Sequence, residues 1–196
     1  MRPNDPTNFP NPHQRGPISP RLVEVSELKL LEAMTIEVPE ILAKSGFGEL
    51  AALLQQHGVR FVIVGGAAVA VHGCRDPLSV DDLDILIDPT AVNAERVLAS
   101  LRSGFLGVPF SAAALAKPRV QLPLKVLHYW GDILTPDTDQ EFGGILSRSI
   151  PARLGSVSVQ VAGRSDLIAM KERAVEREPS DAQKHQHDLT CLKSSH

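Results

Sequence analysis

The apolar and polar residues of this chain follow strand and helix periods around one central stretch. Residues 61–64 form a short apolar, β-branched run, which predicts a buried strand. The run ends at Gly65 and Gly66, where glycine lets the backbone turn tightly or approach a ligand. Small residues over 67–71 then predict a helix that packs closely on a sheet, and the free N–H groups at its start favour a phosphate.

A second strand, with acidic residues at its entry, is predicted directly after this helix. Side chains alternate along a strand, so Asp82 and Asp84 share one face, whereas Leu83 and Ile85 turn into the core. Two carboxylates on one face form half of a divalent-metal site, because buried carboxylates without a partner are costly. A glycine-opened helix beside a D-x-D strand therefore predicts chemistry on a nucleoside triphosphate.

The remaining pattern predicts an α/β domain, a small mixed sheet flanked by helices, over residues 48–192. The predicted helices are 49–57, 92–104, 165–177 (with Ser165 as N-cap) and 181–192, with one helical turn over 112–116. The predicted strands are 121–129 and 156–161. Residues 131–144 are polar and predict a solvated loop, in which Asp137 and Asp139 repeat the D-x-D spacing without an apolar strand to hold them.

The N-terminal quarter of the chain is predicted to lie outside this domain. Residues 1–20 are rich in proline and poor in apolar residues, which predicts a disordered tail. Residues 21–47 have helical spacing with a break at Pro39, which predicts an added helical region.

Composition limits the class of protein further. A chain of 196 residues with 43% hydrophobic and 22% charged residues predicts one globular domain, and a net charge of −3 gives no overall basic field for nucleic acid. No apolar run reaches the length of a membrane span, and no signal peptide is evident, so a cytoplasmic protein without membrane contact is expected. Cys74 and Cys191 have no metal-ligand spacing and are predicted to be reduced.

The central motif resembles a known superfamily. The run VGGAAVAVHG, followed by Arg75 and DDLDILID, resembles nucleotidyltransferases with the polymerase β-like fold, in particular their AbiEii-like branch. Downstream, RSDLIAMK, which ends at Lys171, resembles the DLIA-K helix of that branch. Lys184 and Asp188 fall where the branch has a K/D-rich helix, although an i, i+4 pair can also be a surface ion pair.

The resemblance implies a Mg²⁺- or Mn²⁺-dependent enzyme that moves a nucleoside monophosphate from an NTP to a hydroxyl of RNA, protein or a small molecule. Asp82 and Asp84 would be the catalytic metal ligands, and Lys171 a catalytic or nucleotide-binding residue unless it is a solvated surface lysine. The residues expected to bind the nucleotide are Gly65, Gly66, Arg75 and Lys125. By the same resemblance, tRNA or a protein is a candidate acceptor, and the biological role would be the toxin of a toxin–antitoxin pair with an antitoxin as partner.

One position departs from the family pattern and leaves two functions open. Members usually carry a third acidic residue on a later strand, and the matching place here reads Lys125-Val126-Leu127. A lysine there either removes a metal ligand or contacts the triphosphate itself, and Asp132 is the alternative acidic residue. The alternative function is a catalytically degenerate domain that binds a nucleotide or a partner.

Overall fold

A computed structural model describes residues 36–38, 46–104, 106–126, 129–138 and 140–194, without the side chains of residues 37, 125, 126, 129 and 130. These residues all belong to one of the two compact units of the chain, which runs from Met34 to His196. The disordered tail predicted over 1–20 lies outside the described residues, as do residues 21–35 and 39–45 of the helical region predicted over 21–47.

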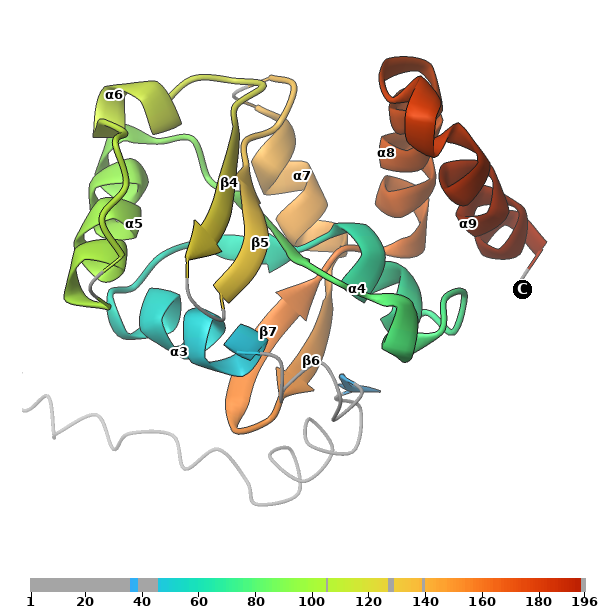
Figure 1. Ribbon diagram of the computed structural model, residues 1–196, viewed down its shortest axis with the longest axis horizontal. Helices are drawn as coiled ribbons and strands as arrows, with labels where there is room; N and C mark the ends of the chain where they lie inside the picture. Colours follow the sequence, from blue (N-terminus) through green and yellow to red (C-terminus); the bar gives the residue numbers. More distant parts are fainter. Residues whose placement is uncertain (1–35, 39–45, 105, 127–128, 139, 195–196) are drawn as a thin grey trace, which may run out of the picture. The chain divides into compact units, whose positions relative to one another are not determined.

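A mixed sheet forms the centre of this unit (Figure 1). Within the described ranges its strands lie in the order β1-β6-β7-β2-β3-β5-β4. They are β1 (Ile36–Glu37), β2 (Phe61–Ile63), β3 (Leu83–Ile87), β4 (Gln121–Val126), β5 (Tyr129–Leu134), β6 (Ile150–Leu154) and β7 (Val157–Val161). Strand β2 is antiparallel to β3 and parallel to β7, and β3 is parallel to β5. The predicted α/β fold with a mixed sheet flanked by helices is confirmed.

Helices surround the sheet, with α5 and α6 at the left of Figure 1 and α8 and α9 packed together at the right. They are α3 (Gly48–Gln56), α4 (Gly65–Val71), α5 (Ala91–Ser103), α6 (Ala112–Leu115), α7 (Glu141–Arg148), α8 (Arg164–Arg177) and α9 (Ala182–Ser194). All predicted helices of the domain are confirmed, although Gly163, and not Ser165, is the N-cap of α8. No helix in the described part of the chain has the length and apolar character that a membrane span requires.

The two central strands, β2 and β3, contribute apolar side chains to the core, and β3 also bears the polar side chain of Asp84 on its other face. Val62 and Ile63 of β2 are at most 1% exposed, as predicted for the apolar run, and so are Leu83 and Ile85 of β3, as the alternation predicted. The N–H of Val64 donates to the carbonyl oxygen of Asp84 at 3.0 Å, which ties the end of β2 to β3. The core therefore fixes the backbone from which the polar face of β3 projects.

The chain between residues 121 and 148 differs from the prediction. Strand β4 ends at residue 126, and residues 129–134 form β5, so the loop predicted over 131–144 is wrong for β5 and for α7. The loop was predicted from the polar character of residues 131–144, and Gly131, Asp132 and the two glycines of α7 are also poor strand or helix formers. Tertiary contact overrides that preference: a Cβ at Gly131 would lie 2.3 Å from the carbonyl oxygen of Leu83, so glycine is what lets β5 pair with β3.

The start of the domain also lies earlier than predicted. Residues 36–37 are not helical but form β1, in which Ile36 pairs with Ala152 of β6. Phe47 is only 1% exposed, so residues just before position 48 already belong to the core. Strand β6 received no prediction, because Pro151 near its start removes a backbone donor and lowers its strand character.

The two cysteines are not reduced thiols as predicted. Cys74 and Cys191 form a disulfide with Cα atoms 5.5 Å apart, across a sequence separation of 117 residues. Spacing along the chain gave no sign of this pairing, because it arises only when α9 folds back beside the segment that follows α4. The disulfide connects the residue that precedes Arg75 with a residue of α9 one helical turn after Asp188.

Candidate functional site

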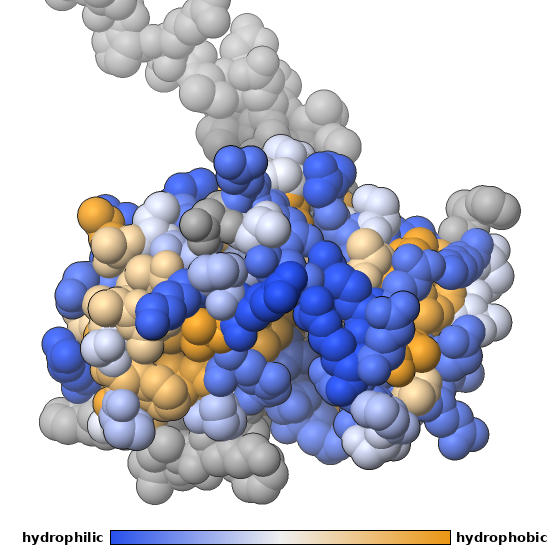
Figure 2. Space-filling model, turned by 90° about the horizontal axis from the view of Figure 1, so that it is seen from above, coloured by the Kyte–Doolittle hydropathy of each residue, from blue (hydrophilic) through white to orange (hydrophobic). Residues whose placement is uncertain are grey.

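A cleft of about 720 Å³ opens between the edge formed by β3, β4 and β5 and the helix α8. Figure 2 views the molecule from above, and strongly hydrophilic residues gather there on both sides of a central hollow. The cleft is lined by the predicted site residues Gly65, Gly66, Arg75, Asp82, Asp84 and Lys171. The side chain of Lys125, the remaining predicted site residue, lies outside the described part of the structure.

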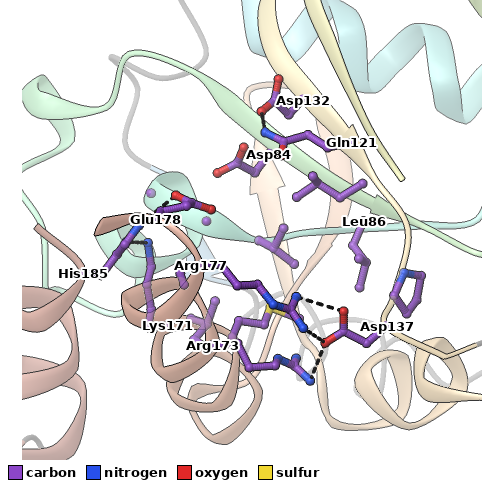
Figure 3. A pocket seen from close by; sticks show the side chains of 18 of the residues that line it. Asp84, Leu86, Gln121, Asp132, Asp137, Lys171, Arg173, Arg177, Glu178 and His185 are labelled. Carbon is purple, nitrogen blue, oxygen red and sulfur yellow. Dashed lines mark hydrogen bonds and ion pairs between the residues drawn. The ribbon is translucent and has the colours of Figure 1, made fainter. Parts of the chain in front are cut away.

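Three aspartates line this cleft, one just before β3 and the others in β3 and β5, and we call Asp82, Asp84 and Asp132 the acidic cluster. Asp84 in β3 is the register partner of Asp132 in the parallel strand β5. Figure 3 shows the carboxylates of Asp84 and Asp132 near each other, with the side-chain amide of Gln121 donating to Asp132. Asp132, the alternative acidic residue that the sequence left open, thus lines the cleft beside Asp84, and Lys125 of β4 pairs with Trp130 of the same strand as Asp132.

Gly65 makes room for the carboxylate of Asp84. Its φ of 62° lies in the left-handed region, and a Cβ built there would be 1.6 Å from Oδ2 of Asp84. The N–H of Gly66 donates a hydrogen bond to the same carboxylate. In this structure the glycine turn thus holds Asp84, which differs from the predicted role of presenting its N–H groups to a phosphate.

The position of Asp84 changes its acidity. The pKa of Asp84 is raised from 3.8 to about 7, first by burial and then by the charges of Asp82 and Asp132, against the opposing effects of Lys171 and the Gly66 N–H. A carboxylate in this state is stabilised by any added positive charge. The acidic cluster therefore has the electrostatics of a cation-binding site.

The donor set suits a hard divalent cation such as Mg²⁺, which takes oxygen ligands and is often held by one or two carboxylates together with substrate phosphates. Among the residues that the structure describes, no three His, Cys, Asp or Glu side chains are grouped closely enough to hold a metal ion by themselves. A cation at Asp82 and Asp84 would thus need ligands from the substrate as well as from the protein.

Lys171 lies inside the protein and not on its surface, so the alternative of a solvated lysine is wrong. The residue is 7% exposed, and its Nζ lies 3.1 Å from Oδ2 of Asp188 and 3.3 Å from Nδ1 of His185. Nε2 of His185 in turn lies 3.0 Å from Oε2 of Glu178. These contacts hold the ammonium group at the cleft, where its charge lowers the pKa of Asp84.

Arg75 and Asp188 form a buried ion pair behind Lys171. The guanidinium of Arg75 donates to both carboxylate oxygens of Asp188, with Nε 3.2 Å from Oδ1, and Asp188 is 1% exposed. A Cβ at Gly66 would lie 2.5 Å from Nη1 of Arg75, so the second glycine makes room for this side chain. Asp188 therefore serves two buried cations, and it is not the partner of a surface pair with Lys184.

Removing Asp188 is expected to be strongly destabilising. In Asp188→Ala, Arg75 and Lys171 would remain buried without their shared anion, which costs about 3–5 kcal/mol in the free energy of unfolding. Urea titration of the oxidised protein measures this loss. Asp166→Ala is the matched control, because its ion pair with the exposed Arg148 lies outside the cleft and its removal should cost much less. Equal losses in the two variants would contradict the assignment.

The structure also brings arginines into the cleft that the sequence left without a role. Arg119, Arg173 and Arg177 surround Asp137, whose side chain is 16% exposed, so the prediction of a solvated Asp137 is wrong. Asp139 lies outside the described residues. The available signal was the i, i+4 spacing of Arg173 and Arg177 on the helix of Lys171, which places both on one face.

No protein-family model matches this chain, and no curated protein matches its sequence. The function is therefore argued from the cleft itself, with the resemblance of the motifs as the source of the hypothesis.

Proposed function

We propose that this protein is a metal-dependent nucleotidyltransferase, which moves a nucleoside monophosphate from an NTP to a hydroxyl group of an acceptor. The observation that carries the proposal is the acidic cluster: Asp84 and Asp132 are register partners on two parallel strands and line one cleft with Asp82 and the buried Lys171. Carboxylates that hold divalent cations, next to a buried ammonium group, suit a reaction whose charge develops on phosphate oxygens.

The cation in this proposal is Mg²⁺ or Mn²⁺, held by Asp82 and Asp84. When bound, such an ion neutralises charge on the phosphate and orients the reacting oxygens. The fit is supported by the oxygen donors and by the raised pKa of Asp84. The ionised form of this carboxyl group is disfavoured by burial and by the neighbouring carboxylates, so a cation would stabilise it.

The residues of the chain would divide the remaining work. The acceptor oxygen forms a bond to the α-phosphorus while the bond from that phosphorus to the pyrophosphate oxygen breaks, and pyrophosphate leaves. The hydroxyl proton passes to Asp132, the carboxylate of the acidic cluster that this proposal does not assign to the cation. Lys171 stabilises the charge on the phosphate oxygens, and its contacts with Asp188 and His185 fix its position.

The acceptor and the biological role are proposed on the resemblance to the AbiEii-like branch. An RNA, with tRNA as one candidate, or a protein hydroxyl would receive the nucleotide, and the chain would act as the toxin of a toxin–antitoxin pair. The competing proposal is a degenerate domain that binds a nucleotide or partner without transfer. Two contacts favour this alternative: the N–H of Gly66 donates to Asp84, and Arg75 is paired with Asp188. Gly66 and Arg75 were both expected to contact the nucleotide.

Transfer of labelled nucleotide separates the two proposals. The oxidised protein is incubated with each α-labelled NTP, with Mg²⁺ or Mn²⁺, and with total RNA or total protein as acceptor. We expect label in one acceptor, reduced at least about 100-fold in Asp82→Asn because a charged group at the reacting phosphate is lost. Asp81→Asn is the matched control, since Asp81 is exposed and does not line the cleft. Nucleotide binding without metal dependence and without label in any acceptor would support the degenerate domain instead.

A further inference from the structure

A second charged group lies in the cleft apart from the acidic cluster, and we call Arg119, Arg173 and Arg177 the arginine cluster. Figure 3 shows Arg173 and Arg177 reaching from α8 towards Asp137, away from Asp84 and Asp132. Nη1 and Nη2 of Arg177 lie 3.0 and 3.2 Å from Oδ1 and Oδ2 of Asp137. Nη1 of Arg173 lies 3.2 Å from Oδ2, and Nε of Arg119 lies 3.4 Å from Oδ1.

The three guanidinium groups of the arginine cluster share two carboxylates, those of Asp137 and Glu141. Both oxygens of Asp137 are engaged by guanidinium groups, and Glu141 accepts from Arg173 at 3.0 Å and from the N–H of Asp137 at 3.1 Å. Two carboxylates thus hydrogen-bond to the guanidinium groups of the arginine cluster, and Glu176 acts on Arg177 through its charge alone. A planar fork of N–H donors on an oxyanion is also the geometry in which arginine binds phosphate.

The segment that carries Arg119 is held in an unusual backbone conformation. Arg119 is the only described residue other than glycine with positive φ, at 59°, a conformation that costs free energy and is often kept at ligand sites. Its N–H donates to the carbonyl oxygen of Pro136 at 2.9 Å, and the hydroxyl of Thr135 donates to the carbonyl oxygen of Lys117 at 2.7 Å. These bonds tie the segment of Arg119 to residues 135–136, which directly precede Asp137.

We propose that the arginine cluster is a phosphate-binding subsite, which the carboxylate of Asp137 occupies in the ligand-free protein and which a phosphate group takes over on binding. The inference rests on the proposed function only for the source of the phosphate, either the polyphosphate of a nucleotide or the backbone of an RNA acceptor. Asp137 is then a built-in competitor that keeps the three guanidinium groups together until the ligand arrives.

The exchange is physically reasonable because the two anions differ in charge and in acceptor number. A phosphate of a polyphosphate offers more acceptor oxygens than a carboxylate and pairs with several guanidinium groups at once. Hydrogen bonds and charge from the arginines lower the pKa of Asp137, so it stays ionised and competes at neutral pH. Removing its charge should therefore strengthen phosphate binding, whereas removing an arginine should weaken it.

The test is calorimetric binding of tripolyphosphate to the full chain, without divalent metal. We expect Asp137→Asn to bind about 10-fold more tightly than the wild type, and Arg177→Gln about 10-fold more weakly, as for gain or loss of one charge-assisted contact. The matched control is Asp166→Asn, which adds the same unit of charge at the Arg148 pair outside the cleft and should leave the affinity within about 2-fold. Circular dichroism checks that each variant is folded.

The proposal is overturned if Asp137→Asn binds tripolyphosphate no better than Asp166→Asn, or if Arg177→Gln binds it as the wild type does. If Asp137→Asn does not fold, the Arg177→Gln result decides alone. Separate titrations with an NTP and with a short single-stranded RNA identify the source, since only the natural ligand should respond to both substitutions. Binding of tripolyphosphate needs neither metal nor transfer and should persist in Asp84→Asn, so a failure here is distinct from a failure of the proposed function.

Discussion

Replacing Asp84 by Asn should abolish nucleotidyl transfer while leaving the fold intact. Asparagine keeps the shape of the side chain beside Gly65, but it removes the charge that would hold the cation at the centre of the acidic cluster. We expect a loss on the order of 10³-fold in the rate of label transfer, the size of effect seen when a charge-stabilising group is removed from a reacting centre. The measurement is incorporation of α-labelled nucleotide into the acceptor identified with the wild type.

The same substitution should make the metal-free protein more stable at pH 8. The pKa of Asp84 is raised from 3.8 to about 7 in the folded state, so the folded protein holds this proton more tightly than the unfolded chain. The corresponding stability is fully present below about pH 3.8 and is lost as the pH rises through about 7. Asparagine never ionises, so Asp84→Asn should gain about 2–4 kcal/mol over the wild type at pH 8, and progressively less towards pH 4.

Mg²⁺ provides the control for this stability effect. The cation should raise the melting temperature of the wild type, since it stabilises the ionised carboxylates, and should have much less effect on Asp84→Asn. Asp81→Asn has the same charge change at an exposed position and should behave as the wild type in both respects. If Asp84→Asn is less stable than the wild type at pH 8, the folded protein does not disfavour the ionised form of Asp84, and the prediction is wrong.

The sequence predicted the central part of the fold because the local signals there agree with the tertiary structure. The β-branched run of β2 and the alternation of β3 match the burial of their residues, and helix α5 has a clear apolar stripe. Strand β5 and helix α7 escaped prediction because Gly131, Asp132 and the glycines of α7 oppose those structures locally. Their conformations depend on contacts that form only in the folded sheet.

The candidate site divides in the same way. Asp82 and Asp84 follow from the period of one strand, so the sequence alone places them on one face. The acidic partner on β5, the burial of Lys171 and the disulfide depend on how distant segments pack, and no spacing along the chain reports that. The register between β3 and β5, which sets Asp132 beside Asp84, is the clearest case, because a shift by one residue would turn the carboxylate to the other face.

Replacing Asp132 by Asn tests whether that register supplies the third acidic residue. Asp132 lines the cleft, and its charge raises the pKa of Asp84, so the substitution should lower the pKa of Asp84 towards its usual range. We expect transfer to fall about 100-fold, because one charged group of the reacting centre is lost. The change in the pKa of Asp84 is measured by NMR titration of its carboxyl carbon, and transfer by label incorporation.

Lys125→Asp completes this test, because the family pattern has its third acidic residue at position 125. In the structure, Lys125 of β4 pairs with Trp130, and Pro123 pairs with Asp132. If Asp132 is the third acidic residue, a carboxylate introduced at position 125 should not restore transfer to Asp132→Asn. Wild-type transfer in Asp132→Asn, or its recovery in the double variant, would assign the acidic role to position 125 instead. Transfer by Asp132→Asn and by the double variant therefore decides which of two positions on adjacent strands supplies the third carboxylate.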